Sequence, residues 1–234
     1  MFRRLALLSL LSLSASAQTF TLDGGAVFTV VPRPTEKVEP FEKGNKPSFA
    51  VPSHASADLK PQGWLHVVDL AEWKNFFAAS PGDLKACVTE PLKALQQSLK
   101  AKAAVPAAGM ALACEDAHQD FLLFPRKVTF NGGTGWLYLT QWMIEAVLPS
   151  NRGIALHFEG VTSDGKTWVQ LTLPVRVEGF PDDEGELMND DKKLRPLIDA
   201  RIKQLKDLGP SAVKPSIDEV EAVLKTMQIS SRKP

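Results

Sequence analysis

Residues 154–177 read IALHFEGVTSDGKTWVQLTLPVRV, and this stretch decides the fold. Asp164-Gly165 stands between two runs in which apolar residues alternate with others, a pattern typical of a β-hairpin with a two-residue turn. Such a turn pairs Ser163 with Lys166, and each step outward adds one further pair. The sequence therefore predicts both a hairpin and its register.

The predicted register separates the hairpin into two faces. Three apolar pairs share one face: Phe158 with Leu171, Leu156 with Leu173, and Ile154 with Val175. The opposite face pairs Val161 with Trp168, Glu159 with Gln170, and His157 with Thr172. One face is thus expected in the core, and the other is mixed and mostly polar.

The polar face supplies the candidate binding residues. They are His157, Glu159, Trp168 and Gln170, with Thr172 beside them. An aromatic ring next to hydrogen-bonding groups suits a recognition surface. Helices that cover this face would instead make it a second core face. The sequence leaves both interpretations open.

Outward from the hairpin, the chain predicts more strands and several helices. Strands are expected over 63–70 and 136–141, the second after the glycine-rich turn Asn131–Gly135. We expect an α+β fold with an antiparallel sheet, whose hairpins span about residues 121–178, covered by helices that include a C-terminal pair. The glycine-rich turn lacks the lysine of a phosphate-binding loop.

Helix signals are clear at three places. Residues 89–102 carry Leu92, Leu95 and Leu99 at helical spacing. Another helix is expected from about Pro196, with Leu197, Ile198, Ile202, Leu205 and Leu208 on one side, until Gly209-Pro210 ends it. The last helix begins at Ser216, where Glu219 three residues later completes a capping box.

The N-terminal residues predict export. Arg3 and Arg4 precede an apolar run, and small residues end at Ala17, as in a cleavable signal peptide over residues 1–17. Residues 18–62 contain a short strand or hairpin and then a proline-rich strap, and residues 63–234 are expected to form a single α+β domain. We expect an extracytoplasmic protein, either periplasmic or secreted.

Charge and hydropathy exclude some partners. The chain has 27 basic and 27 acidic residues, and without Arg3 and Arg4 25 basic residues remain. The chain therefore lacks the excess of basic residues that is typical of proteins that bind nucleic acid or an anionic membrane. No segment after the signal peptide is long and apolar enough to suggest a transmembrane helix.

The chain has two cysteines, Cys87 and Cys114. An isolated pair in an exported chain is typical of a structural disulfide bond. The alternatives are a thiol nucleophile or a metal pair, although the spacing matches neither a C-x-x-C redox motif nor a zinc knuckle. A disulfide bond between Cys87 and Cys114 is the prediction.

The middle of the chain resembles an uncharacterised family of exported bacterial proteins. The shared patterns are N-G-x-G-x-x-x-L-T-Q and F-x-G-x-T-x-D-G-K, followed by L-P-V. They are carried by Asn131, Gly133, Gly135, Leu139, Thr140 and Gln141, by Phe158, Gly160, Thr162, Asp164, Gly165 and Lys166, and by 173–175. Leu137 and Glu159 depart from it, since the family tends to have arginine and glutamine there. The resemblance implies an exported location and a related sheet, but no activity.

Catalytic and metal-binding patterns are sparse. Glu115, Asp116 and His118 lie close together in sequence, which suits a hydrolase site but equally a solvated approach to a strand. The acidic run 182–191 lacks the glycine and glutamate positions of an EF-hand, which leaves a solvated loop or a looser calcium site. No cofactor and no metal are predicted.

Three functions remain after these exclusions. The first is a non-catalytic binding or interaction module of the bacterial cell envelope, whose partner is an envelope protein or a small ligand. The alternative is an envelope-acting hydrolase that uses Glu115, Asp116 and His118. In the third, the C-terminal helices dock on a partner during assembly.

Overall fold

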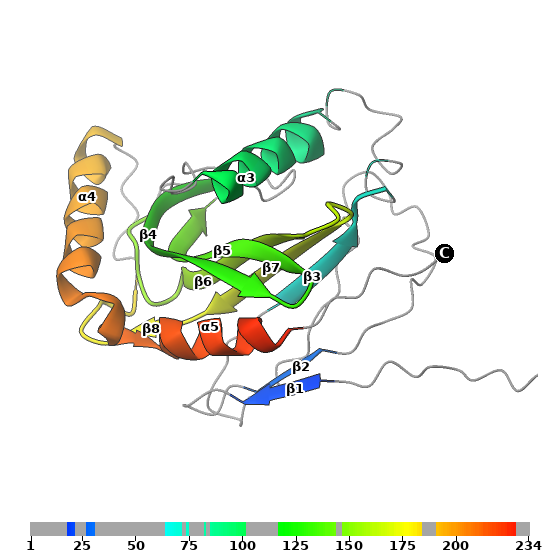
Figure 1. Cartoon of the computed structure of the whole chain (residues 1–234). Helices are drawn as coiled ribbons and strands as arrows, with labels where there is room; N and C mark the ends of the chain where they lie inside the picture. The colour runs from blue at the N-terminus through cyan, green and yellow to red at the C-terminus, as the bar shows by residue number, and fades with distance from the viewer. Residues whose placement is uncertain are drawn as a thin grey trace, which may run out of the picture.

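A five-stranded antiparallel sheet forms the centre of the protein (Figure 1). The computed structural model describes residues 18–21, 27–30, 64–71, 74, 82, 85–101, 117–143, 147–183 and 191–227. The strands follow the order β3-β7-β6-β5-β4. Their bounds are β3 Trp64–Asp69, β4 His118–Phe130, β5 Gly133–Met143, β6 Ile154–Thr162 and β7 Thr167–Pro174.

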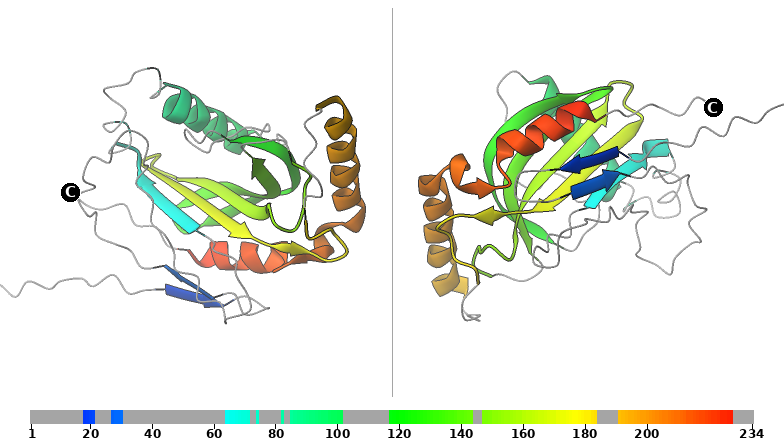
Figure 2. Two further views of the ribbon diagram at one scale, coloured as in Figure 1. Left: turned by 180° about the vertical axis from the view of Figure 1, so that it is seen from behind. Right: turned by 90° about the horizontal axis from the view of Figure 1, so that it is seen from below.

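Helices lie on both sides of this sheet. Helix α3 (Glu90–Lys100), which follows a short π-helical turn over Lys85–Thr89, lies on one side, and α5 (Ile217–Thr226) lies on the other (Figures 1 and 2). Helix α4 (Asp191–Leu208) stands at one end of the sheet. The predicted α+β class, with an antiparallel sheet and C-terminal helices, is confirmed.

Two small sheets complete the fold. Strands β1 (Gln18–Thr21) and β2 (Val27–Val30) form the hairpin predicted near the N-terminus. Strand β8 (Arg176–Val177) pairs with β9 (Val213–Lys214), which follows the 3-10 turn Pro210–Ala212. The predicted signal peptide and the proline-rich strap lie outside the described residues.

The register of the central hairpin is confirmed. Phe158 pairs with Leu171 and Leu156 with Leu173, while His157, Glu159 and Val161 pair with Thr172, Gln170 and Trp168. The backbone N–H of Val175 donates to the carbonyl of Ile154 at 3.2 Å, which extends the same register outward. Alternation and the position of Asp164-Gly165 were therefore sufficient to align the two strands.

The predicted two-residue turn is wrong. The connection has four residues, since β6 ends at Thr162 and the Gly165 N–H donates to the Thr162 carbonyl at 2.8 Å. The carboxylate of Asp164 accepts hydrogen bonds from the Thr162 hydroxyl (2.6 Å) and the Lys166 N–H (3.0 Å). These bonds hold the pKa of Asp164 below its usual value. The Asp164 side chain thus stabilises a wider turn without changing the register.

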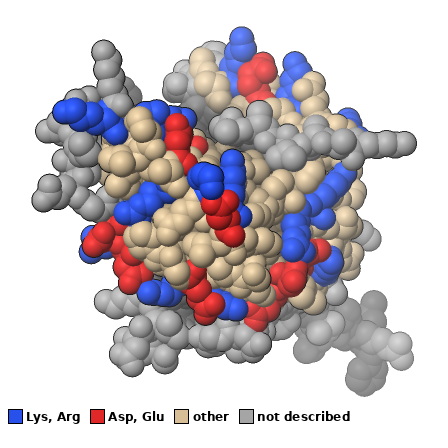
Figure 3. Space-filling view, turned by 90° about the vertical axis from the view of Figure 1, so that its left-hand side faces the viewer, with Lys and Arg blue, Asp and Glu red and all other residues tan. Residues whose placement is uncertain are grey.

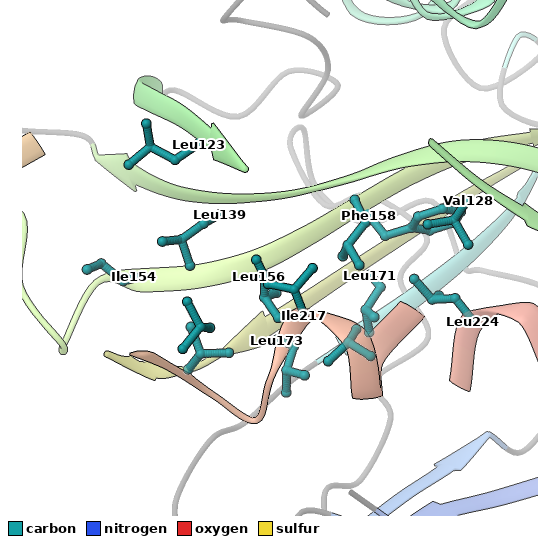
Figure 4. Packing of buried hydrophobic residues seen from close by; sticks show 14 of the residues in the cluster. Leu123, Val128, Leu139, Ile154, Leu156, Phe158, Leu171, Leu173, Ile217 and Leu224 are labelled. Carbon is teal, nitrogen blue, oxygen red and sulfur yellow. The ribbon is translucent and has the colours of Figure 1, made fainter. Parts of the chain in front are cut away.

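The larger core lies between the sheet and α5 (Figure 4). Helix α5 begins at the predicted capping box, in which the Ser216 hydroxyl and the Glu219 carboxylate each bond the other residue's backbone N–H. Its apolar stripe packs on the sheet through Ile217, Val220 and Leu224. Arg126 of β4 adds an ion pair with Asp218 at 2.6 Å.

The glycines of the two sequence patterns make room for this core. Gly135 and Gly160 pair across β5 and β6, and the aromatic rings of Phe130 and Phe158 lie against them. A Cβ atom on Gly135 would stand 2.3 Å from the Glu159 carbonyl oxygen. Glycine at these positions therefore serves close packing of the sheet rather than chemistry.

Helix α4 begins earlier than predicted. It starts at Asp191, so Pro196 is the sixth residue of the helix and cannot donate the N–H that would bond to the carbonyl of Lys192. Leu194, Ile198 and Leu205 are buried, whereas Leu197 is 42 % exposed and does not belong to the packed side. The prediction failed because it took the proline as the start of the helix.

The outer side of α4 carries charges of both signs. Arg195 pairs with Asp199 at 3.4 Å, and Lys203 pairs with Asp207 at 2.5 Å. Figure 3, which faces this end of the molecule, shows basic and acidic side chains intermixed rather than gathered by sign. Exposed pairs of this kind contribute little to stability, about 0.3–0.5 kcal/mol each.

Asn151, in the turn before β6, ties this turn to the segment after β7. Its amide N–H groups donate to the carbonyls of Val177 (3.2 Å) and Phe180 (2.9 Å) and to the Asp182 carboxylate (3.0 Å). Its side-chain oxygen accepts the Val177 N–H at 2.7 Å. The bond from Asn151, followed by that from Arg176, keeps the pKa of Asp182 below its usual value.

Replacing Asn151 by alanine is expected to lower the free energy of unfolding by about 2–4 kcal/mol, because several partly buried backbone groups lose their partner. Urea unfolding followed by circular dichroism measures this change. Arg152→Ala, at the exposed neighbouring position, is the control and should cost less than about 0.5 kcal/mol. Equal stability of the two variants would show that water replaces the Asn151 bonds.

Candidate binding site on the α3 face of the sheet

The four candidate binding residues lie on one face of the sheet, opposite the α5 core. Gln170 of β7, Glu159 of β6 and Trp136 of β5 form one row across the strands. Thr172, His157 and Tyr138 form the next row on the same face. Two rows of side chains therefore meet in the middle of the sheet, and we call Tyr138, His157, Glu159, Trp168 and Gln170 the Glu159 cluster.

Helix α3 covers this part of the sheet. Its Leu92 and Leu95 pack with Trp136, Tyr138 and Trp168 in a second hydrophobic core. The remaining members of that core are Leu70, Val88 and Val161. Of the two interpretations open from sequence, the structure shows a covered face.

Two hydrogen bonds fix α3 against the sheet. The indole N–H of Trp136 donates to the Ser98 hydroxyl at 3.0 Å, and that hydroxyl donates to the Leu95 carbonyl at 2.8 Å. The Lys127 ammonium donates to the carbonyl of Leu99. Helix α3 is thus held at its C-terminal half, beside the Glu159 cluster.

Glu159 is the anomalous member of the cluster. Its side chain is 0 % exposed, and its neighbours by register and alternation, Trp136, Val161 and Trp168, belong to the apolar core under α3. Neither carboxyl oxygen makes a hydrogen bond of ordinary geometry. A buried carboxylate without a partner costs several kcal/mol, so the neutral acid is favoured.

Burial raises the pKa of Glu159 well above its usual value. The indole N–H of Trp168 lowers that pKa in part, although the two groups do not meet at hydrogen-bond geometry. The Tyr138 phenol lies close enough to Glu159 for the charge of that carboxyl group to affect its pKa. Burial first, and then the charge that Glu159 would carry, raises the pKa of the Tyr138 phenol well above its usual value. The Gln119 side chain lowers that pKa in part, although it does not meet the Tyr138 hydroxyl at hydrogen-bond geometry.

His157 has defined contacts on this face of the sheet. It is 0 % exposed, and its Nδ1 lies 3.0 Å from the Thr172 hydroxyl. Its ring stands 5.3 Å from the ring of Tyr138 and 5.9 Å from that of Trp142, both in tilted arrangements. The imidazole is therefore part of the packing of this face.

Five buried atoms of the cluster have no hydrogen-bond partner. They are the Tyr138 hydroxyl, both carboxyl oxygens of Glu159, the Trp168 indole nitrogen and the Gln170 amide nitrogen. The large majority of buried side-chain polar atoms in native proteins are paired. Several on three adjacent strands indicate that a further molecule, ordered water or a ligand, completes the cluster. Hydrogen-bond donors and acceptors beside aromatic rings can bind a small polar molecule. No member of the Glu159 cluster is an evident nucleophile.

Tyr138 and Trp136 are members of this site that sequence reasoning did not identify. The strand that contains them was predicted. The connection between β5 and β6 did not predict how these two strands pair, so the sequence did not show that Trp136 and Glu159 lie side by side. The odd-even alternation of 136–141 alone could have placed Trp136, Tyr138 and Thr140 together.

The other predicted sites are less informative. His118 begins β4 and pairs with Met143, while Glu115 and Asp116 lie outside the described residues. Cys87 lies in the π-helical turn Lys85–Thr89, and Cys114 lies outside the described residues. Within the part of the chain that the structure describes, no three histidine, cysteine or acidic residues are placed to hold a metal ion.

Comparison with protein-family models, with curated proteins and with solved structures gives no match for this chain. Among the described helices, none has the combination of length and apolar character that a membrane crossing requires. The fold and the Glu159 cluster therefore carry the functional argument.

Proposed function

We propose that this protein is an exported binding module of the bacterial cell envelope, which holds a small polar ligand at the Glu159 cluster. The observation that carries the proposal is the set of five buried polar atoms without hydrogen-bond partners on β5, β6 and β7. A ligand with both donor and acceptor groups would pair them and recover the free energy of their desolvation.

Two sequence features support export. Residues 1–17 have the three parts of a signal peptide, and an exported location permits the Cys87–Cys114 disulfide bond. That bond would connect the turn before α3 to the chain ahead of β4, and so restrain the cover of the site. The resemblance to exported proteins points to the same location.

The test is native mass spectrometry of the full chain expressed with its leader and recovered from the envelope fraction. The expected result is a protein that carries one additional small mass, which denaturation releases. Trp168→Phe removes one indole donor and keeps most of the ring packing, so it should lose more than half of the bound mass. Lys166→Ala, at the exposed hairpin tip, is the matched control and should retain it.

The ligand proposal would be contradicted by a protein that has only the mass of its chain, although circular dichroism shows that it is folded. Its mass would also have to stay the same after a broad metabolite extract is added. The hydrolase alternative with Glu115, Asp116 and His118 stays a hypothesis, and no contact among the described residues favours it. A docking role for the C-terminal helices is less supported, since the apolar stripe of α5 already packs in the core.

A further inference from the structure

We propose that two copies of this chain pair edge to edge through strand β3 and form a two-fold dimer with one continuous sheet. The inference rests on the backbone of the sheet and is independent of the Glu159 cluster. Strands β3 and β4 are the two edges of the five-stranded sheet (Figure 1). Among the strands that the structure describes, only β7 pairs with β3, while β1 and β2 pair with each other.

One of these edges, β4, is protected against further pairing. Proline, positive charge and bulges on an edge strand prevent another strand from adding to it. Strand β4 has all three features, since it contains Pro125, Arg126 and Lys127 and its register with β5 shifts at two places. The second shift includes Phe124, whose φ of 52° interrupts the extended backbone. Strand β4 is therefore closed to an additional strand.

The other edge, β3, has none of these features. It reads WLHVVD, without proline, lysine or arginine, and its register with β7 has no shift along its whole length. Aromatic and β-branched residues of this kind favour extended strands. A regular, unprotected edge strand is a template on which another strand can pair.

The ladder between β3 and β7 shows which backbone groups point outward. The Leu70 N–H donates to the Lys166 carbonyl at 2.8 Å, which makes these two residues a hydrogen-bonded pair of the ladder. Such pairs alternate along antiparallel strands, so the even-numbered residues of β3 bond to β7. The backbone N–H and C=O groups of the odd-numbered residues therefore point away from the sheet, and these residues are Leu65, Val67 and Asp69.

A second copy of β3 matches this row of backbone groups. In an antiparallel pairing centred on Val67, each Val67 faces the other, and Leu65 faces Asp69 of the partner subunit. All three outward residues then lie in hydrogen-bonded pairs, each of which exchanges two bonds. The edges that remain are the two protected β4 strands, so the assembly closes at two copies. This closure favours a second copy as the occupant of β3.

The experiment measures the mass of the full chain, recovered from the envelope fraction, by light scattering during gel filtration at several concentrations. The expected mass is twice that of the chain. Val67→Pro removes an outward N–H at the centre of the interface and keeps the bonds to β7, because an edge strand tolerates proline where its N–H faces outward. This variant should weaken the dimer by about 10-fold or more, while its circular dichroism stays unchanged.

Thr129→Pro is the matched control on the other edge of the sheet. The Ser163 N–H donates to the Gly132 carbonyl, so the odd-numbered residues of β5 bond to β4. Thr129 pairs with the even-numbered Thr134, which directs its N–H away from β5, and its side chain is exposed. Thr129→Pro should therefore form the dimer as well as the unaltered chain does.

An added cysteine gives a test that does not depend on how well β3 accepts proline. At the centre of the proposed pairing, the Cα atoms of the two Val67 residues would lie about 5.5 Å apart, which is within the range of a disulfide bond. Val67→Cys should therefore form a covalent dimer under mild oxidation. Thr129→Cys carries the same additional thiol on the other edge and should not.

Three results would overturn the proposal. A folded chain that remains monomeric at every concentration would leave β3 to another segment of this chain or to a different protein. A folded Val67→Pro that dimerises as strongly as the unaltered chain would place the interface elsewhere. Equal cross-linking of Thr129→Cys and Val67→Cys would likewise show that β3 is not the contact between the copies.

Discussion

Glu159→Gln is expected to make the protein more stable than the unaltered chain, and this difference in the free energy of unfolding should grow as the pH rises. Glutamine has nearly the same shape as the protonated acid, so the two proteins should be similarly stable near pH 4. The pKa of Glu159 in the folded protein lies above its usual value of 4.5. The folded protein therefore keeps a proton that the unfolded chain gives up, and its stability falls as the pH rises from 4.5 toward the folded pKa.

The advantage of Glu159→Gln should grow by about 1.4 kcal/mol per pH unit over that interval and then become constant. Urea unfolding from pH 4 to pH 9 measures it, and Glu178→Gln at an exposed position is the control. A difference that does not depend on pH would show that folding does not raise the pKa of Glu159. The same titration locates the folded pKa, because the two curves run parallel above it.

Gly135→Ala is expected to reduce the free energy of unfolding by about 3 kcal/mol or more, at the upper end of overpacking effects. The added methyl group would stand 2.3 Å from the Glu159 carbonyl oxygen and 2.5 Å from the Phe158 ring. The ring can rotate, but the carbonyl belongs to the neighbouring strand. The strands must therefore separate where β5 meets β6, directly beneath the Glu159 cluster.

Thr134→Ala is the matched control for this variant. Thr134 is the preceding residue of β5 and is only partly buried, so its replacement should cost less than about 1 kcal/mol. Thermal and urea unfolding of both variants decide the comparison. Equal stability of Gly135→Ala and Thr134→Ala would contradict the close approach of β5 and β6.

The sequence was sufficient to predict the local structure of the hairpin but not its cover. Alternation over 154–177 aligned β6 with β7 correctly, and the capping box at Ser216 placed the start of α5. Both signals depend on residues only a few positions apart. The number of residues in the turn depended on the Asp164 side chain, and this competition between side chain and backbone was not visible in the dipeptide Asp164-Gly165.

The sequence predicted only part of the candidate site, for a related reason. His157, Glu159, Trp168 and Gln170 could be placed on one face by pairing across a single turn. Their burial depended on α3, which precedes them by about sixty residues, and on Tyr138 in a strand joined by a longer connection. Periodicity shows that Leu92 and Leu95 need a partner surface, but it does not show which surface.

A crystal structure of the full chain, refined at about 1.2 Å or better, tests the central claim most directly. It should show a small non-protein molecule between α3 and the sheet, with donors at hydrogen-bond distance from Glu159 and from the Tyr138 hydroxyl. If ordered water alone pairs these atoms, or if Glu159 is open to solvent, the cluster is not a ligand site.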